Sequence, residues 1–249
     1  MNRAKEHLAE FERAVLAFLQ TEPYGAVGTK EVDEGEEYLV WRFQINATAP
    51  ARLGAIAGDI VHNARAALDL LACQFVSIAG GTDADINRGK FPFGQNKAIF
   101  ESELKDKLKK IRASARRFIK RLKPYKGGNR TLWLLHAADL RDKHRLLIPV
   151  GAVDRHITIM PNLGLKPGDK IPTMKLSIKR NGFLEDGEEI FRFPVLPYPF
   201  EKTINYQFRF EICLHGVEGL PEEPAMHTLM KFVSYAEKIV AIAERRRLI

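Results

Sequence analysis

The string GDIVHNARAALD, residues 58–69, carries the side chains best suited to chemistry. His62, Arg65 and Asp69 follow the spacing i, i+3 and i+7, which places them within about 60° of one another on a helix. An imidazole moves protons near neutral pH, and a guanidinium holds anions. One interpretation is therefore a site at which His62 moves a proton while Arg65 holds a negatively charged group.

The alternative is an internal polar network. Asp69 lies four residues after Arg65, and Asp59 lies three residues before His62, which are spacings at which helical side chains form pairs. Residues 50–79 contain no Lys and no Glu, the usual residues of a solvated helix face. The short or planar groups used instead suit fixed hydrogen bonds, and they predict a face that is partly buried against a partner.

A second cluster, HAADLRDKHR at residues 136–145, is the best candidate for that partner. It stands where a predicted helix ends, and functional side chains often gather at the ends of elements. Cations at the C-terminus of a helix also complement its dipole, which is the alternative explanation for Lys143, His144 and Arg145. The candidate catalytic residues are His62, Arg65, Asp69, Asp142, His144 and Arg145.

A basic segment spans residues 105–126 and holds eleven Lys or Arg against one Asp, whereas the whole chain has a net charge of +8. Such a segment can contact phosphates, or it can be the solvated face of a helix whose apolar stripe is buried. The two interpretations are compatible because one helix has both faces. The candidate nucleic-acid-binding residues are Lys109, Arg112, Arg116, Arg117, Lys120 and Arg121.

Composition and missing motifs narrow the function classes. The 249 residues include two cysteines, Cys73 and Cys213, so no disulfide framework is expected. No signal peptide and no apolar run of membrane-spanning length occur, so we expect a cytoplasmic protein without a membrane partner. HxxxH, HExxH, GxGxxG, P-loop and GxSxG motifs are absent, and we expect neither metal nor cofactor.

The periodicity of the chain predicts an α+β fold in one integrated domain. Residues 2–20 and about 50–145 read as helices, with breaks near 80–96, 104–106 and 124–128. An antiparallel sheet is expected from about 36–47 plus 146–215, with clear alternation at 37–46, 173–179 and 203–215. An amphipathic helix at about 222–247 closes the chain.

Several separated strings resemble a widespread family of uncharacterised bacterial proteins: GDIVHNARAALD, FPF, KPYKGG, and LWLLH with DKHRLL. A more distant likeness is to HEPN helical bundles, many of which are metal-independent ribonucleases that place an Arg four to six residues before a His, often across a dimer interface. Leu70 stands where that His is expected. The resemblance thus implies the helical bundle, and a homodimer is among its expectations.

These observations lead to two main hypotheses. In the first, the protein binds RNA or cleaves it without a metal: His62 or His144 activates a ribose 2′-hydroxyl, and Arg65 and Arg145 stabilise the phosphorane. In that mechanism Asp69 or Asp142 orients the catalytic groups. In the second, the protein is a non-catalytic module whose polar residues lock helix 50–79 to helix 129–143. An enzyme acting on another anionic or phosphate-bearing ligand fits the same residues.

Overall fold

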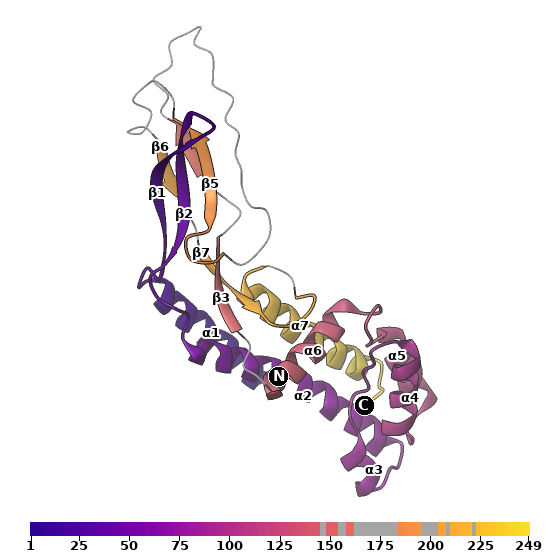
Figure 1. Ribbon diagram of the computed structural model, residues 1–249. Coiled ribbons are helices and arrows are strands. Elements are labelled where there is room, and N and C mark those ends of the chain that lie inside the picture. The colour runs from indigo at the N-terminus through magenta and orange to yellow at the C-terminus, as the bar shows by residue number, and fades with distance from the viewer. Residues whose placement is uncertain (145–147, 154–157, 162–183, 196–203, 208–209, 221–222) are drawn as a thin grey trace. The chain divides into compact units, whose positions relative to one another are not determined.

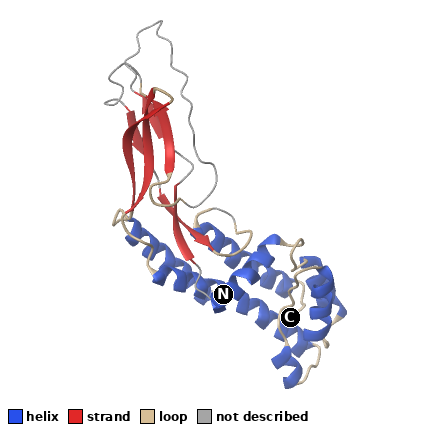
Figure 2. Ribbon diagram, viewed as in Figure 1, coloured by secondary structure: helices blue, strands red, loops and turns tan. Residues whose placement is uncertain are grey.

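The computed structural model confirms the α+β class: helices and antiparallel strands occupy separate parts of the chain (Figures 1 and 2). It describes residues 1–144, 148–153, 158–161, 184–195, 204–207, 210–220 and 223–249. The chain forms two compact units. The helical unit comprises Met1–Ala14, Pro50–Pro149 and Leu214–Ile249, and the sheet unit comprises Val15–Ala49 and Val150–Cys213. The single integrated domain stays a prediction.

The helical unit is built around a long central helix. The helices are α1 (Asn2–Leu19), α2 (Ala51–Ile78), α3 (Asp83–Arg88), α4 (Lys97–Lys107), α5 (Ala113–Leu122), α6 (Arg130–His144) and α7 (Ala225–Arg245). Helix α2 packs against α6, α7 and the short α3, and α6 also packs against α7. In Figure 1, α3, α4 and α5 lie together at one end of this unit. The predicted helices at 2–20, 50–79, 129–143 and 222–247 are thereby confirmed.

The apolar face predicted for α2 forms the core of the helical unit. Its buried side chains recur every three or four residues, which is the period of a helix that buries one face. On the predicted face they are Leu53, Ile56, Ile60, Ala64, Leu68, Leu71 and Phe75, whereas Ala67 is only half-buried. The helix also buries Ala57, Val61, Ala72 and Val76 beside that face. Buried side chains of α6 and α7 complete the core, among them Leu132, Leu135, Leu229, Phe232 and Ala236. Each fully buried Leu or Phe contributes about 1.5–3 kcal/mol.

Two local features of the helical unit differ from the prediction. Residues 82–96, expected as a loop, include α3, because Thr82 and Asp85 form a capping box that starts a helix. The helix expected at 106–122 begins only at Ala113. The Arg116 guanidinium donates to the Leu108 carbonyl at 2.9 Å, which satisfies a backbone group that the break leaves exposed.

The described strands lie mostly in the sheet unit, although β3 begins and β7 ends in the helical unit. They are β1 (Tyr24–Asp33), β2 (Glu36–Ile45), β3 (Ile148–Val153), β4 (Thr158–Pro161), β5 (Glu189–Pro194), β6 (Ile204–Gln207) and β7 (Phe210–His215). The hydrogen-bonded orders are β1-β2-β5, β3-β7 and β4-β6. The strand predicted at 37–46 is confirmed as β2, and it pairs antiparallel with β5 as expected. The strand predicted at 173–179 lies outside the described residues.

Strand β1 was not predicted, because most of its side chains are exposed and show no alternation. It is held by β2 across a tight turn in which Glu34 and Gly35 both have positive φ, 49° and 84°. Positive φ at both central residues matches the twist of a two-residue hairpin. Across the hairpin, Arg42 Nη2 lies 2.8 Å from Glu31 Oε1. The pairing partner rather than the local sequence pattern therefore stabilises β1.

Candidate functional site

His62 faces α6 and meets a buried carboxylate there. Its Nδ1 lies 3.3 Å from Asp139 Oδ1, in a contact that joins residues 77 positions apart. The His62 side chain is 58% exposed, whereas that of Asp139 is 4% exposed. Because a carboxylate accepts hydrogen bonds, the proton of this contact sits on Nδ1 and leaves Nε2 directed elsewhere. His62 therefore pairs with Asp139 rather than with Asp59.

One turn earlier on α2, the Asp142 carboxylate lies directly against the helix backbone at Gly58. A Cβ atom at Gly58 would stand 2.2 Å from Asp142 Oδ1, far inside van der Waals contact. Gly58 thus lets α6 approach α2 closely at this level. The second cluster, residues 136–145, does meet residues 58–69 as the sequence suggested, and the contacts that the described residues show come from Asp139 and Asp142.

Arg65 and Asp69 form the predicted i, i+4 pair, with Arg65 Nη1 2.6 Å from Asp69 Oδ1. Both side chains also hold the backbone of the FPF segment. Arg65 Nη2 donates to the Phe91 carbonyl at 3.1 Å, and the Phe91 amide donates to Asp69 Oδ1 at 2.7 Å. Arg65 is only 7% exposed. This pair therefore fixes an extended segment of the chain against α2.

Phe93 extends the same assembly toward α6. The Arg65 guanidinium carbon lies 4.4 Å from the centroid of the Phe93 ring, which is a cation–π contact. The His136 ring stacks on Phe93 with 4.4 Å between centroids and 12° between planes. A buried guanidinium, a phenyl ring and an imidazole therefore join α2, the FPF segment and α6.

Gly94 connects this assembly to the turn after α5. Its amide donates to the Pro124 carbonyl at 3.2 Å, and its carbonyl accepts from the Lys126 amide at 3.1 Å. Residues 123–128, KPYKGG, are therefore tied through the FPFG segment to Arg65 and Asp69 on α2. The separated strings that the sequence analysis singled out interlock here, which supports a structural role for Arg65 and Asp69.

The exposed cations of the basic segment form a distinct surface on α5. Arg117, Lys120 and Arg121 are all exposed, and we call this set the α5 basic face. The opposite side of the helix buries Ala115, Phe118 and Ile119. Lys120 lies 3.8 Å from Glu101 in an exposed pair, and no described carboxylate pairs with Arg117 or Arg121. Both predicted faces of this helix are thus present.

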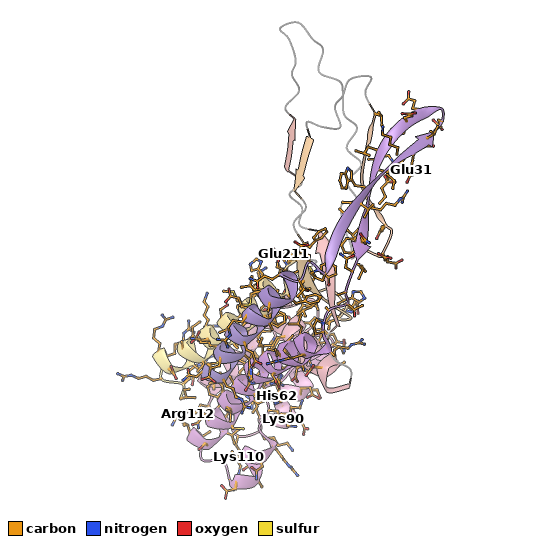
Figure 3. All side chains as sticks on the ribbon, turned by 90° about the vertical axis from the view of Figure 1, so that its left-hand side faces the viewer. Glu31, His62, Lys90, Lys110, Arg112 and Glu211 are labelled. Carbon is orange, nitrogen blue, oxygen red and sulfur yellow. The ribbon has the colours of Figure 1, made fainter. Side chains whose placement is uncertain are left out.

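Lys109, Lys110, Arg112 and Arg116 of the basic segment have partners within the protein. Lys110 Nζ lies 2.9 Å from Asp85 Oδ2, and Arg112 Nη2 donates to the Ile78 carbonyl at 3.2 Å. Figure 3 labels both cations at the α3 end of the helical unit and His62 farther along α2. Arg116 bonds to the Leu108 carbonyl, and Lys109 lies 3.6 Å from Asp106.

The predicted residues therefore divide into three groups. His62 and Asp142 meet α6 and α2, respectively, and Arg65 and Asp69 hold the FPF segment. The side chains of His144 and Arg145 lie outside the described part of the chain. Sequence reasoning left three contributors out of the candidate set: Asp139, Gly58 and Phe93. The i, i+3 spacing of Asp139 and Asp142 on one helix face was the signal that could have found Asp139.

The described residues contain no cluster of three or more His, Cys, Asp or Glu side chains placed to hold a metal ion. In the same part of the chain, no helix has the length and apolar character needed to cross a membrane. Comparisons of the chain with family models, curated proteins and solved structures found no match.

Proposed function

We propose that the protein binds nucleic acid, and specifically RNA, and that the α5 basic face makes contacts with the phosphates. The observation that carries the proposal is the exposure of Arg117, Lys120 and Arg121 on one side of a helix whose other side is buried. Because the backbone of α5 is already folded and packed, binding does not have to order the segment that carries these cations, which favours association. Each phosphate contact also releases condensed counterions.

Charge segregation supports the same function. The basic segment 105–126 carries eleven cationic residues and one acidic residue, so the remainder of the chain is about neutral. Lys110, Arg112 and Arg116 anchor this segment to α3, to the end of α2 and to the preceding turn. The anchored cations hold α5 in place, and the exposed ones remain accessible to a ligand.

The test is a binding titration of labelled RNA at several salt concentrations. The triple variant Arg117→Ala/Lys120→Ala/Arg121→Ala is expected to bind about tenfold or more weakly, with a salt slope smaller by about 2–3. The matched control, Arg3→Ala/Arg13→Ala/Lys238→Ala, removes the same charge from exposed positions on α1 and α7. Equal weakening in both variants, or no binding by the unmodified protein at low salt, would overturn the proposal.

RNA cleavage is a second candidate, favoured by the exposed His62 ring backed by the buried Asp139 carboxylate. In this mechanism His62 Nε2 takes the proton of a ribose 2′-hydroxyl, and that oxygen attacks the adjacent phosphorus. The P–O5′ bond breaks and the leaving O5′ takes a proton from water, which gives a 2′,3′-cyclic phosphate and a free 5′-hydroxyl, and His62 later returns its proton to solvent. Labelled RNA incubated with the protein or with His62→Ala tests this candidate, and identical cleavage by both would refute it.

A further inference from the structure

We infer that the nucleic acid bound by the α5 basic face is double-stranded, and that it is held by its backbone rather than by its bases. The inference rests on the proposed function and names the class of ligand for the same surface. It depends on which side chains surround Arg117, Lys120 and Arg121, and on how those cations are spaced.

Aromatic side chains are turned away from this surface. Between residues 83 and 130, all described, Phe91, Phe93, Phe100 and Phe118 are buried. Tyr125 is half-buried and packs on Phe100, with 5.6 Å between the ring centroids. Proteins that bind single strands usually stack the bases on exposed aromatic rings, which contribute about 1–3 kcal/mol per base. Among residues 83–130, which include α5, no exposed aromatic side chain offers such a platform.

The close spacing of the cations on α5 suits a ligand whose phosphate charges are densely placed. Arg117 and Arg121 stand four residues apart, and Lys120 lies between them on the same side of α5. Helical residues three or four apart have Cβ atoms roughly 5–6 Å from one another. A duplex carries one negative charge per roughly 1.7 Å of its axis, about twice the charge per length of a single strand. Three cations so close together therefore gain more from a duplex.

An anionic membrane is the rival ligand for a basic helix. A helix that binds in the membrane interface presents large apolar side chains beside its cations. The exposed residues of α5 are Ala113, Arg117, Lys120 and Arg121, and its larger apolar side chains face the core. The composition of the exposed face therefore favours nucleic acid over lipid.

The experiment compares three ligands for the full chain at one salt concentration. They are an RNA duplex of about 20 base pairs, longer than the roughly 16 that dedicated duplex-binding domains span, a uridine single strand of equal charge, and vesicles of phosphatidylcholine and phosphatidylserine. The duplex is expected to bind about tenfold or more tightly than the single strand, because stacking is absent and counterion release is larger. The vesicles are expected to bind weakly.

The triple variant distinguishes a failure of the duplex assignment from a failure of the proposed nucleic-acid binding. Loss of the duplex advantage in Arg117→Ala/Lys120→Ala/Arg121→Ala, with folding verified by circular dichroism, supports the inference. A single strand that binds as tightly as the duplex overturns the duplex assignment and leaves the proposed function standing. Tight vesicle binding with no binding of either RNA, or RNA binding that the triple variant leaves unchanged, overturns the proposed function itself.

Discussion

The Asp142 carboxylate of α6 lies in direct contact with the backbone of α2 at Gly58, where a Cβ atom would stand 2.2 Å from Asp142 Oδ1. Four residues later on α2, His62 meets Asp139, one turn before Asp142 on α6. The two contacts run along an antiparallel pair of helices, and they set how closely and in which register α2 and α6 pack.

Gly58→Ala is expected to destabilise the protein by about 1–3 kcal/mol, because the added methyl group overlaps the Asp142 carboxylate. This is opposite to the gain of about 1 kcal/mol that Ala gives over Gly in an open helix. Urea unfolding measures the change. Asp142→Ala is the partner variant, and the double variant should be more stable than the sum of the single effects predicts. A more stable Gly58→Ala protein would contradict the close contact.

Arg65→Ala is expected to lower the free energy of unfolding by about 1.5–3 kcal/mol, because it leaves the partly exposed Asp69 carboxylate without its buried cationic partner. It also removes the guanidinium that binds the Phe91 carbonyl and contacts Phe93. The control is Arg52→Ala, whose side chain is 74% exposed and pairs with Glu10 at the surface. A surface pair contributes about 0–1 kcal/mol. Similar losses in the two variants would refute the structural role of Arg65.

His62→Ala is expected to destabilise the protein by about 1–3 kcal/mol, because it removes a hydrogen-bond partner of the buried Asp139 carboxylate. Asn63→Ala is the control on the same helix, since the Asn63 amide donates only to the carbonyl of Asp59 one turn earlier. Thermal unfolding compares the two. A His62→Ala protein as stable as Asn63→Ala would argue against a network that locks α2 to α6.

Acid sensitivity is expected to depend on Asp85. The Lys110 ammonium and the Thr82 hydroxyl hold the pKa of this carboxyl well below its usual range. A carboxyl with a lowered pKa in the folded state stabilises the protein above its unfolded pKa of about 4, and that stabilisation is lost as the pH falls further. Melting temperatures measured from about pH 6 down to about pH 2 should therefore fall less steeply for Asp85→Asn. An unchanged slope would contradict the prediction.

The sequence determined the elements whose stability is local or periodic. Apolar residues every three or four positions fixed α2 and its buried face from Leu53 to Phe75. The alternation at 37–46 identified β2, and the concentration of Lys and Arg after residue 104 identified the basic segment. Strand β1 was not predicted because most of its side chains are exposed, so only its pairing with β2 specifies it as a strand.

The candidate site also has a part that the sequence predicted and a part that only the tertiary structure shows. The Arg65–Asp69 pair was predictable, since residues four apart on a helix are neighbours wherever that helix packs. Three contacts could be learned only from the tertiary structure. His62 pairs with Asp139, and the Asp142 carboxylate contacts the backbone at Gly58. Arg65 donates to the Phe91 carbonyl and contacts the Phe93 ring. Those contacts depend on the register between packed elements distant in the chain. No local pattern encodes that register, because it is set by how all the side chains of the core fit together.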